Sequence, residues 1–175
     1  LPGHPHFSYR DGQLTAENRD IAKLAEEFGT PLFIYSKASM LAALGAYQKG
    51  FVLLIVAICY VMRAESNVAV LQGAARAGGG LDTVSGGELD RVIAAGGDAA
   101  KVIFSGVGKT RAEMRHALNL GVGCFNVESE AELEVLNEVA LAVGKTANVS
   151  IRVNPNVDPK THPYISTGLK GSKFG

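Results

Sequence analysis

Three helix-start signals, each just after an apolar run of strand length, constrain the fold of this 175-residue chain more than any other feature. Each has the pattern Ser/Thr-x-x-Glu, in which the hydroxyl accepts from the N3 amide and the Glu carboxylate reaches back to the cap amide. The three boxes occupy residues 85–88, 110–113 and 129–132. One match would be weak evidence, but three matches after three apolar runs predict successive βα units.

The apolar runs recur at a regular interval. They begin near Ile55, Leu81, Val102, Cys124 and Val149. A helical pattern follows each of the first four runs, and the glycines that mark the helix ends are Gly78, Gly96, Gly121 and Gly144. Near-continuous apolar strands are typical of a parallel sheet covered on both faces. Parallel strands with helical crossovers form either a doubly wound sheet or a (β/α)8 barrel.

The barrel is the favoured alternative. No G-x-G-x-x-G motif follows the first run, as a dinucleotide-binding fold would require. The α/β fold we predict is a partial (β/α)8 TIM-type barrel of about five βα units, and a closed barrel has eight strands in about 250 residues. We therefore interpret the chain as a fragment. Before the barrel, the pattern predicts a short helix that Pro31 ends, a strand over residues 32–35 and a second helix capped by Ser36.

The composition excludes several classes of function. Lys+Arg and Asp+Glu balance at 17 each, so nothing indicates a nucleic-acid or membrane-surface partner. The apolar run 51–62 is shorter than the roughly 20 residues of a membrane-spanning helix, and its β-branched residues predict a buried strand with its lead-in. Cys59 and Cys124 have no close-spaced partner and predict buried thiols. We expect a soluble protein of the cytoplasm.

Candidate functional residues follow the predicted strands, because the working groups of a barrel lie at the carboxyl ends of its strands. Polar side chains recur there in one register: Arg63, Asp82, Ser85, Ser105, Asn126, Glu128 and Arg152. The alternative for the serines is a role as turn and cap residues only. His162 follows the last strand in a long loop, where both an active-site role and a purely structural role are open.

One stretch has the appearance of a phosphate-binding loop. Residues 106–110 read Gly-Val-Gly-Lys-Thr, like the end of the motif Gly-x-x-x-x-Gly-Lys-Ser/Thr. The first glycine of that motif would have to stand at position 103, which is Ile103. The match fails, and Thr110 is better explained as a helix cap.

Taken in order, these stretches resemble diaminopimelate decarboxylase, a family of pyridoxal-phosphate enzymes of the alanine-racemase-like barrel class. The resemblance covers nearly the whole chain. Its residues are 7–12, 29–35, 80–89, 104–110, 151–156, 162–168 and 172–175. Such long, ordered matches are far more specific than one short motif.

The resemblance implies two domains, a cofactor and a reaction. Residues 1–48 would contribute to a β-domain and lead into the barrel, and residues 49–175 would form an incomplete barrel that binds pyridoxal 5'-phosphate. The family removes carbon dioxide from the D-centre of meso-diaminopimelate to give L-lysine. The resemblance also implies a small-molecule amino-acid substrate and a homodimer.

The resemblance further implies site residues, and one departs from the family. The first barrel strand of the family ends in Cys-Tyr-Ala-Met-Lys-Ala-Asn, whereas residues 59–65 read Cys-Tyr-Val-Met-Arg-Ala-Glu. Arg63 thus stands at the position of the Schiff-base lysine, and a guanidinium is no amine nucleophile. Asp82 would orient the amine or steady the cofactor, and Arg152 would donate to the ring oxygen or to Asp82. Ser85 would also contact the cofactor.

Three interpretations of the function stay open, and the first is a diaminopimelate decarboxylase, as the resemblance implies. The substitution at Arg63 favours a catalytically inactive relative that binds the cofactor or a partner without turnover. Another barrel-type decarboxylase or a racemase is the third alternative. For Asp82 and Arg152, a structural ion pair between the two is the alternative to a functional role.

Overall fold

The chain begins with a small antiparallel sheet that the sequence pattern did not predict. The structure, a computed structural model, describes residues 4–162 and 164–171, so the matching stretch 172–175 lies outside the described residues. The sheet has the order β1-β2-β3. Its strands are β1 (Phe7–Arg10), β2 (Gln13–Ala16) and β3 (Arg19–Asp20). Asp11 and Gly12 join the first two with φ of 49° and 78°, as a two-residue hairpin turn requires.

Two helices follow, as predicted. Helix α1 (Ile21–Phe28) is capped by Asp20, and helix α2 (Lys37–Gly50) is capped by Ser36. The strand expected over residues 32–35, as part of a β-domain completed elsewhere, does not form in the described chain: this segment pairs with no other strand and leads directly into α2. An apolar run long enough for a strand forms none where no neighbouring backbone is present to pair with it.

Glu17 connects the small sheet to α2. Its Oε1 accepts from the Ser36 hydroxyl at 2.7 Å and from the Ala38 amide at 3.0 Å. The Ala38 amide first, and the Ser36 hydroxyl second, hold the pKa of Glu17 below its ordinary value. The negative charge therefore lies at the first turn of α2, where the helix dipole favours it.

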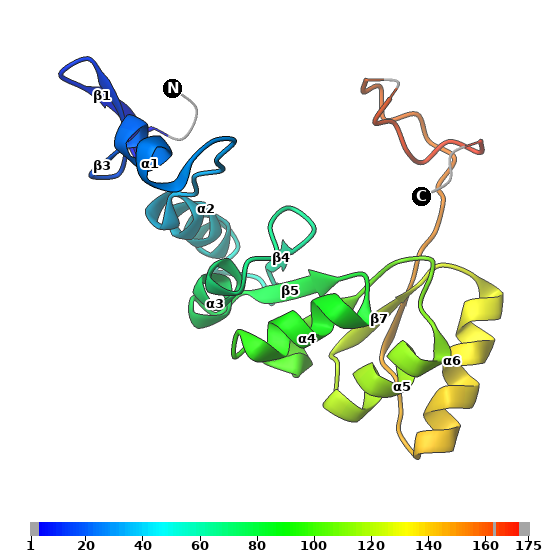
Figure 1. Ribbon diagram of the computed structural model, residues 1–175. Helices are drawn as coiled ribbons and strands as arrows, with labels where there is room; N and C mark the ends of the chain where they lie inside the picture. Colours follow the sequence, from blue (N-terminus) through cyan, green and yellow to red (C-terminus); the bar gives the residue numbers. More distant parts are fainter. Residues whose placement is uncertain (1–3, 163, 172–175) are drawn as a thin grey trace.

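The predicted partial barrel is confirmed as a five-stranded parallel sheet in which each strand pairs with the next along the chain, in the order β4-β5-β6-β7-β8 (Figure 1). The strands are β4 (Cys59–Val61), β5 (Gly80–Thr83), β6 (Val102–Phe104), β7 (Cys124–Val127) and β8 (Val149–Ile151). The crossovers are α3 (Val68–Arg76), α4 (Gly86–Ala94), α5 (Arg111–Leu120) and α6 (Glu130–Val143), with a 3-10 turn, η1 (Ala99–Lys101), before β6. Among the described residues, β4 and β8 form the two edges of this sheet.

The core lies between the sheet and its helices. The side chains of Phe104 in β6 and Phe125 in β7 are fully buried, with ring centroids 6.0 Å apart. Leu89 of α4, Met114 of α5 and Leu136 of α6 belong to the same buried cluster. One apolar face from each crossover helix thus covers one side of the sheet, which fixes the loops at the carboxyl ends of the strands.

The three predicted caps all form, but only one is a complete capping box. Thr110 and Glu113 make both reciprocal bonds at α5. At α4 and α6 the serine hydroxyl accepts from the N3 amide as predicted. The N3 glutamates, however, accept from the amide one residue before the cap, that of Val84 at 2.7 Å and that of Glu128 at 3.4 Å.

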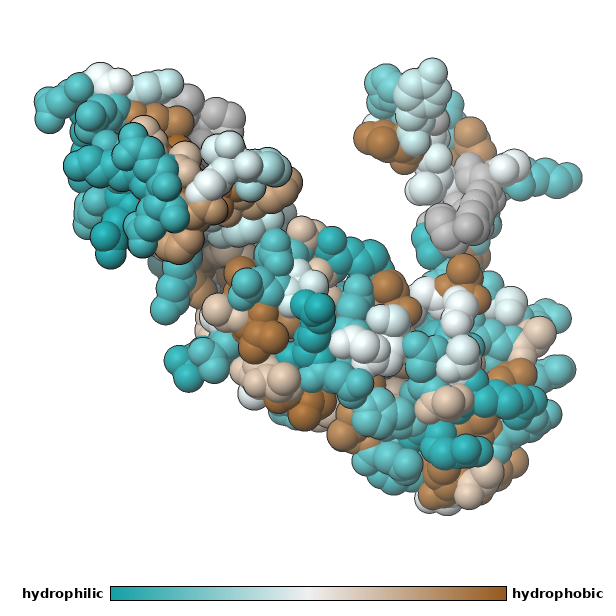
Figure 2. All heavy atoms as spheres, in the orientation of Figure 1, coloured by the Kyte–Doolittle hydropathy of each residue, from teal (hydrophilic) through white to brown (hydrophobic). Residues whose placement is uncertain are grey.

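The buried strand predicted within residues 51–62 begins later than the expected start near Ile55, and it is only partly buried. Residues 51–54 form turns after α2, and β4 begins only at Cys59. Leu53 is 94% exposed and Ile55 fully exposed. Figure 2 shows that apolar surface is interspersed with polar surface over the visible face.

No helix of the described residues is both long and apolar enough to cross a membrane.

Candidate active site

A cavity of about 670 Å³ lies at the carboxyl ends of the five parallel strands. Its volume is within the range of small-molecule sites, about 300–1,000 Å³. The residues that line it are Arg63, Asp82, Val84, Ser105, Gly106, Val107, Asn126, Glu128, Ser150 and Arg152. Every strand from β4 to β8 contributes a residue from its end or from the loop after it, so the parallel register itself assembles the site.

Arg63 and Asp82 form an ion pair on one side of this cavity. The Arg63 Nη2 lies 3.8 Å from Asp82 Oδ2, and the two side chains are 47% and 18% exposed. The other carboxylate oxygen, Asp82 Oδ1, is buried and has no hydrogen-bond partner. Among the described residues that are not exposed, no other side-chain nitrogen or oxygen is both buried and without a partner. A buried acceptor without a partner costs about 1–3 kcal/mol, so this oxygen favours a ligand that donates to it.

Cys59, at the start of β4, is a free thiol near Asp82. Burial raises its pKa, and the negative charge of Asp82 raises it further. The thiol therefore stays protonated near neutral pH and acts as a small apolar side chain rather than as a nucleophile.

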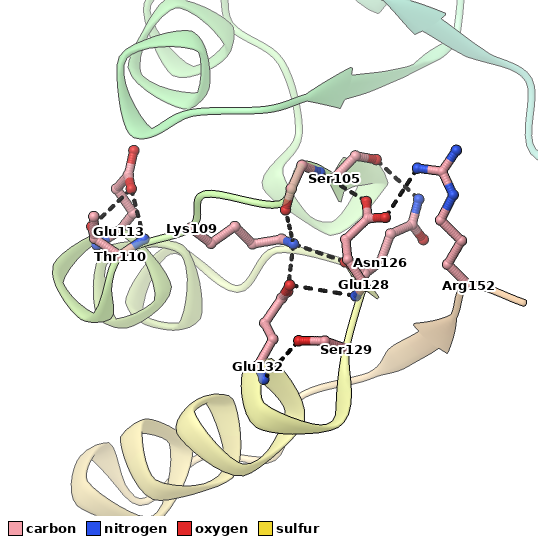
Figure 3. A network of polar contacts seen from close by, with 10 residues as sticks. Ser105, Lys109, Thr110, Glu113, Asn126, Glu128, Ser129, Glu132 and Arg152 are labelled. Atoms are coloured by element: carbon pink, nitrogen blue, oxygen red, sulfur yellow. Dashed lines mark hydrogen bonds and ion pairs between the residues drawn. The ribbon is translucent and has the colours of Figure 1, made fainter. Parts of the chain in front are cut away.

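Arg152 and Glu128, after β8 and β7, form a second ion pair in the lining of the cavity (Figure 3). Arg152 Nη1 donates to Glu128 Oε2 at 3.0 Å, and the Glu128 side chain is only 8% exposed. Glu128 Oε1 accepts from the amide of Gly106 at 3.2 Å. The backbone of Arg152 is fixed as well, because its amide donates to the carbonyl of Val127 at 3.0 Å. The guanidinium thus has a defined position at the strand ends.

Ser105 and Asn126 complete the wall between the two ion pairs. Asn126 Nδ2 donates to Ser105 Oγ at 2.9 Å, and the Ser105 amide continues the sheet ladder to the carbonyl of Thr83 at 2.8 Å. The sequence placed Ser105, Asn126 and Glu128 at strand ends but assigned them no role. The signal available was the register they share with Asp82.

Lys109, the lysine of the stretch that resembles a phosphate-binding loop, has a structural role in the described chain. Its ammonium donates to the carbonyls of Gly106 at 2.6 Å and Asn126 at 2.8 Å and to Glu132 Oε1 at 2.5 Å (Figure 3). Its side chain has no exposed surface. The lysine points into the protein rather than toward a bound phosphate.

The structure brings Arg63, Asp82 and Arg152 together and places two other candidates elsewhere. Ser85 does not line the cavity, and its hydroxyl caps α4 by accepting from the Glu88 amide at 3.2 Å. His162 is exposed, and its ring lies 5.3 Å from that of Tyr164. In Figure 1 the segment after β8, orange to red, extends away from the sheet. The functional roles of all five residues stay predictions.

Comparisons with known proteins agree with this arrangement. Residues 37–175 match the model of a family described as pyridoxal-dependent decarboxylase, pyridoxal binding domain. The chain is 56% identical over 169 residues to diaminopimelate decarboxylase of Pseudomonas aeruginosa, covering 97% of this chain and 41% of the relative. The corresponding enzyme of Aquifex aeolicus is 45% identical over 172 residues, covering 98% and 40%. The chain thus spans about two fifths of the length of these curated relatives.

Solved structures give the same result. A diaminopimelate decarboxylase from M. jannaschii in complex with L-lysine superposes with a TM-score of 0.89 at 38% identity, covering 100% of this chain and 42% of that one. The enzyme from Helicobacter pylori complexed with L-lysine gives 0.83 at 41%, covering 89% and 40%. A viral arginine decarboxylase, from Paramecium bursaria Chlorella virus, shares only the fold, with a TM-score of 0.67 at 17% identity, covering 81% and 37%.

Proposed function

Since this chain belongs to the pyridoxal-dependent decarboxylases through their pyridoxal-binding domain, we propose that it is part of a diaminopimelate decarboxylase. The proposed reaction is the pyridoxal-phosphate-dependent removal of one carboxylate from meso-2,6-diaminopimelate to give L-lysine, a carboxy-lyase step of lysine biosynthesis. The observation that carries the proposal is the 56% identity to such an enzyme over 97% of this chain. With it come a small amino-acid substrate, a homodimer and a cytoplasmic location.

The residues at the strand ends fit non-covalent binding of pyridoxal phosphate. The cavity is large enough for a small aromatic ligand. The Oδ1 of Asp82, which has no partner, would accept a hydrogen bond from a ligand donor, and the guanidinium of Arg152, oriented by Glu128, would donate to an anionic oxygen of the cofactor. When bound, the cofactor supplies an electron sink for the electrons that a departing carboxylate leaves behind.

The same residues do not fit covalent attachment of the cofactor. Attachment needs an amine, and the cavity is lined by no lysine among the described residues. Arg63 occupies the position that the family gives to the lysine, and its delocalised guanidinium is not a nucleophile. Lys109 is no substitute, because its ammonium is buried and already bonded to three acceptors.

A catalytically inactive, cofactor-binding relative is therefore the second candidate function. The observation that favours it is the ion pair of Arg63 with Asp82 at 3.8 Å. Arg63 keeps the positive charge that a lysine would have at this position, but it lacks the amine that would form a Schiff base. A barrel-type decarboxylase for a different amino acid has weaker support, because the arginine and lysine/ornithine decarboxylases compared are only 17–23% identical.

The decisive experiment tests two questions separately: whether the protein has decarboxylase activity, and which amino acid is its substrate. The protein carrying this chain, with Arg63→Lys and without it, is incubated with pyridoxal phosphate and meso-diaminopimelate, and carbon dioxide and L-lysine are quantified. Formation of L-lysine by the Arg63→Lys protein alone supports both the family reaction and the inactivity of the natural sequence. Turnover by the unchanged protein excludes the second candidate. Turnover of ornithine or arginine in preference to meso-diaminopimelate contradicts the proposed substrate.

A further inference from the structure

We infer that Lys109 is a positioning residue: its buried ammonium holds the wall of the cavity from behind and thereby sets where Glu128 and Arg152 face the ligand. The inference uses the proposed function only in treating the cavity as a cofactor site. It gives a role to the Gly-Val-Gly-Lys-Thr stretch, which the failed phosphate-loop motif leaves unexplained.

The contacts of Lys109 join three elements that meet behind the cavity. Its acceptors are the carbonyl of Gly106 in the loop after β6, the carbonyl of Asn126 in β7 and the carboxylate of Glu132 in α6. A lysine ammonium has three N–H donors, so each donor has one acceptor. Gly106 and Asn126 both line the cavity, whereas Lys109 does not.

A second set of hydrogen bonds links Lys109, through Glu132, to the charged groups of the cavity, Glu128 and Arg152. Glu132 holds Lys109 with Oε1 and accepts from the Glu128 amide with Oε2 at 3.4 Å. The Glu128 carboxylate then accepts from the Gly106 amide at 3.2 Å and from Arg152 at 3.0 Å. Gly106 is thus held through its carbonyl by Lys109 and through its amide by Glu128. In Figure 3 these side chains form one continuous network from α6 to the end of β8.

The variants must separate positioning from simple folding. Lys109→Met alone leaves the largely buried carboxylate of Glu132 without a cation, and breaking one half of a buried pair is strongly destabilising. Lys109→Met with Glu132→Gln removes both charges at nearly constant volume. Glu132→Gln alone also unpairs a buried charge, that of Lys109, but it keeps the bonds from Lys109 to the two carbonyls and an amide oxygen in place of the carboxylate. Lys145→Met is the matched control, because Lys145 is exposed and its ammonium donates to the carbonyl of Asn119 at 3.2 Å.

The first measurement is amide hydrogen exchange by NMR on the full chain. In the double variant we expect the amides of Gly106 and Glu128 to exchange about tenfold faster or more, because a local opening no longer breaks the lysine bonds. The core amide of Phe125, which bonds to the carbonyl of Asn148, stays within about twofold of the unchanged protein. Neither Glu132→Gln nor Lys145→Met reproduces the change at Gly106.

The second measurement is the dissociation constant of pyridoxal phosphate for the same proteins, followed by fluorescence. We expect the double variant to bind about tenfold more weakly, since loss of preorganisation lowers affinity, and Lys145→Met to bind like the unchanged protein. Equal exchange at Gly106 in the double variant and in Glu132→Gln overturns the inference. Uniform loss of protection, at Phe125 as at Gly106, also overturns it, since it assigns Lys109 to global stability. If the unchanged protein binds no pyridoxal phosphate, the proposed function fails, and the exchange data alone decide the role of Lys109.

Discussion

Asp82 offers one carboxylate oxygen to Arg63 at 3.8 Å and keeps the other buried without a hydrogen-bond partner. The cation beside this carboxylate is half exposed, and as a guanidinium it cannot act as an amine. This geometry preserves the charge balance of a site for an amine and lacks the amine itself.

Restoring the amine is expected to restore covalent capture of the cofactor. Arg63→Lys places a primary amine within the cavity, next to the Asp82 carboxylate. After incubation with pyridoxal phosphate and reduction with borohydride, mass spectrometry should find the cofactor attached at position 63. The matched control is Arg76→Lys, which adds a lysine at the exposed end of α3. Absence of an adduct at 63, or equal labelling at 76, would count against the family role of this position.

Neutralising Asp82 is expected to leave the fold intact. Asp82→Asn removes a half-exposed ion pair, which is worth less than about 1 kcal/mol. It also removes the charge from a buried oxygen without a partner, whose burial costs about 1–3 kcal/mol. The free energy of unfolding from urea titration should therefore stay the same or rise by up to about 1 kcal/mol, while the affinity for pyridoxal phosphate falls. A large destabilisation would show that Asp82 has a structural role.

The carboxylate of Glu113 is expected to make stability depend on pH. It accepts from the amide of Gly86 in α4 at 2.8 Å and from Thr110, the cap of α5, at 2.9 Å. The Gly86 amide first, and the Thr110 amide second, hold the pKa of Glu113 below its ordinary value of 4.5. Since the folded pKa is the lower one, this stabilisation is complete above pH 4.5 and is lost as the pH falls through the folded pKa.

The matching variant is Glu113→Gln. It should lower the free energy of unfolding by about 1–2 kcal/mol at pH 7, and the difference from the unchanged protein should shrink below pH 4.5. Urea titrations at pH 7 and at several lower values measure this. Glu134→Gln, at an exposed position of α6, is the control. A difference that stays constant with pH would show that the Glu113 charge is not the cause.

The exposed apolar run after α2 is expected to drive self-association. Leu53 and Ile55 lie almost fully in solvent, and an uncharged, exposed apolar segment favours association between chains. Leu53→Lys with Ile55→Lys should reduce the apparent mass in light scattering and leave the unfolding midpoint unchanged. A charge placed instead at the buried Leu71 should unfold the chain. If the unchanged protein is already a monodisperse monomer, the run does not act in this way.

The sequence predicted the sheet and its crossovers because their signals are local. A hydroxyl such as that of Thr110 caps α5 through an amide only three residues away, and apolar runs such as that around Val102 fix the buried strands. The small sheet at the start of the chain was missed, although Asp11 and Gly12 form a pair typical of hairpin turns. Its strands are too short to show a period.

The remaining differences from the prediction have a different cause. Residues 32–35 and the first half of the run 51–62 have the composition of strands and are not paired. Composition reports the preference of a segment, whereas pairing depends on a neighbour that the segment itself does not encode. For the site, strand-end register brought out Asp82 and Arg152. The same register also included Arg63 and Glu128. Which of these side chains pairs with Asp82 and which with Arg152 depends on side-chain directions, and residue spacing does not determine those.

The order of the parallel sheet also bears on how the protein is made. Because each strand pairs only with strands that are its neighbours along the chain, paired residues such as Cys59 with Gly80 and Leu81 with Val102 stand a single βα unit apart in the sequence. Each closing loop is therefore short, and contacts between close neighbours in sequence form fast. A nascent chain can add one strand to the sheet as each unit leaves the ribosome, so that synthesis and assembly proceed in the same direction.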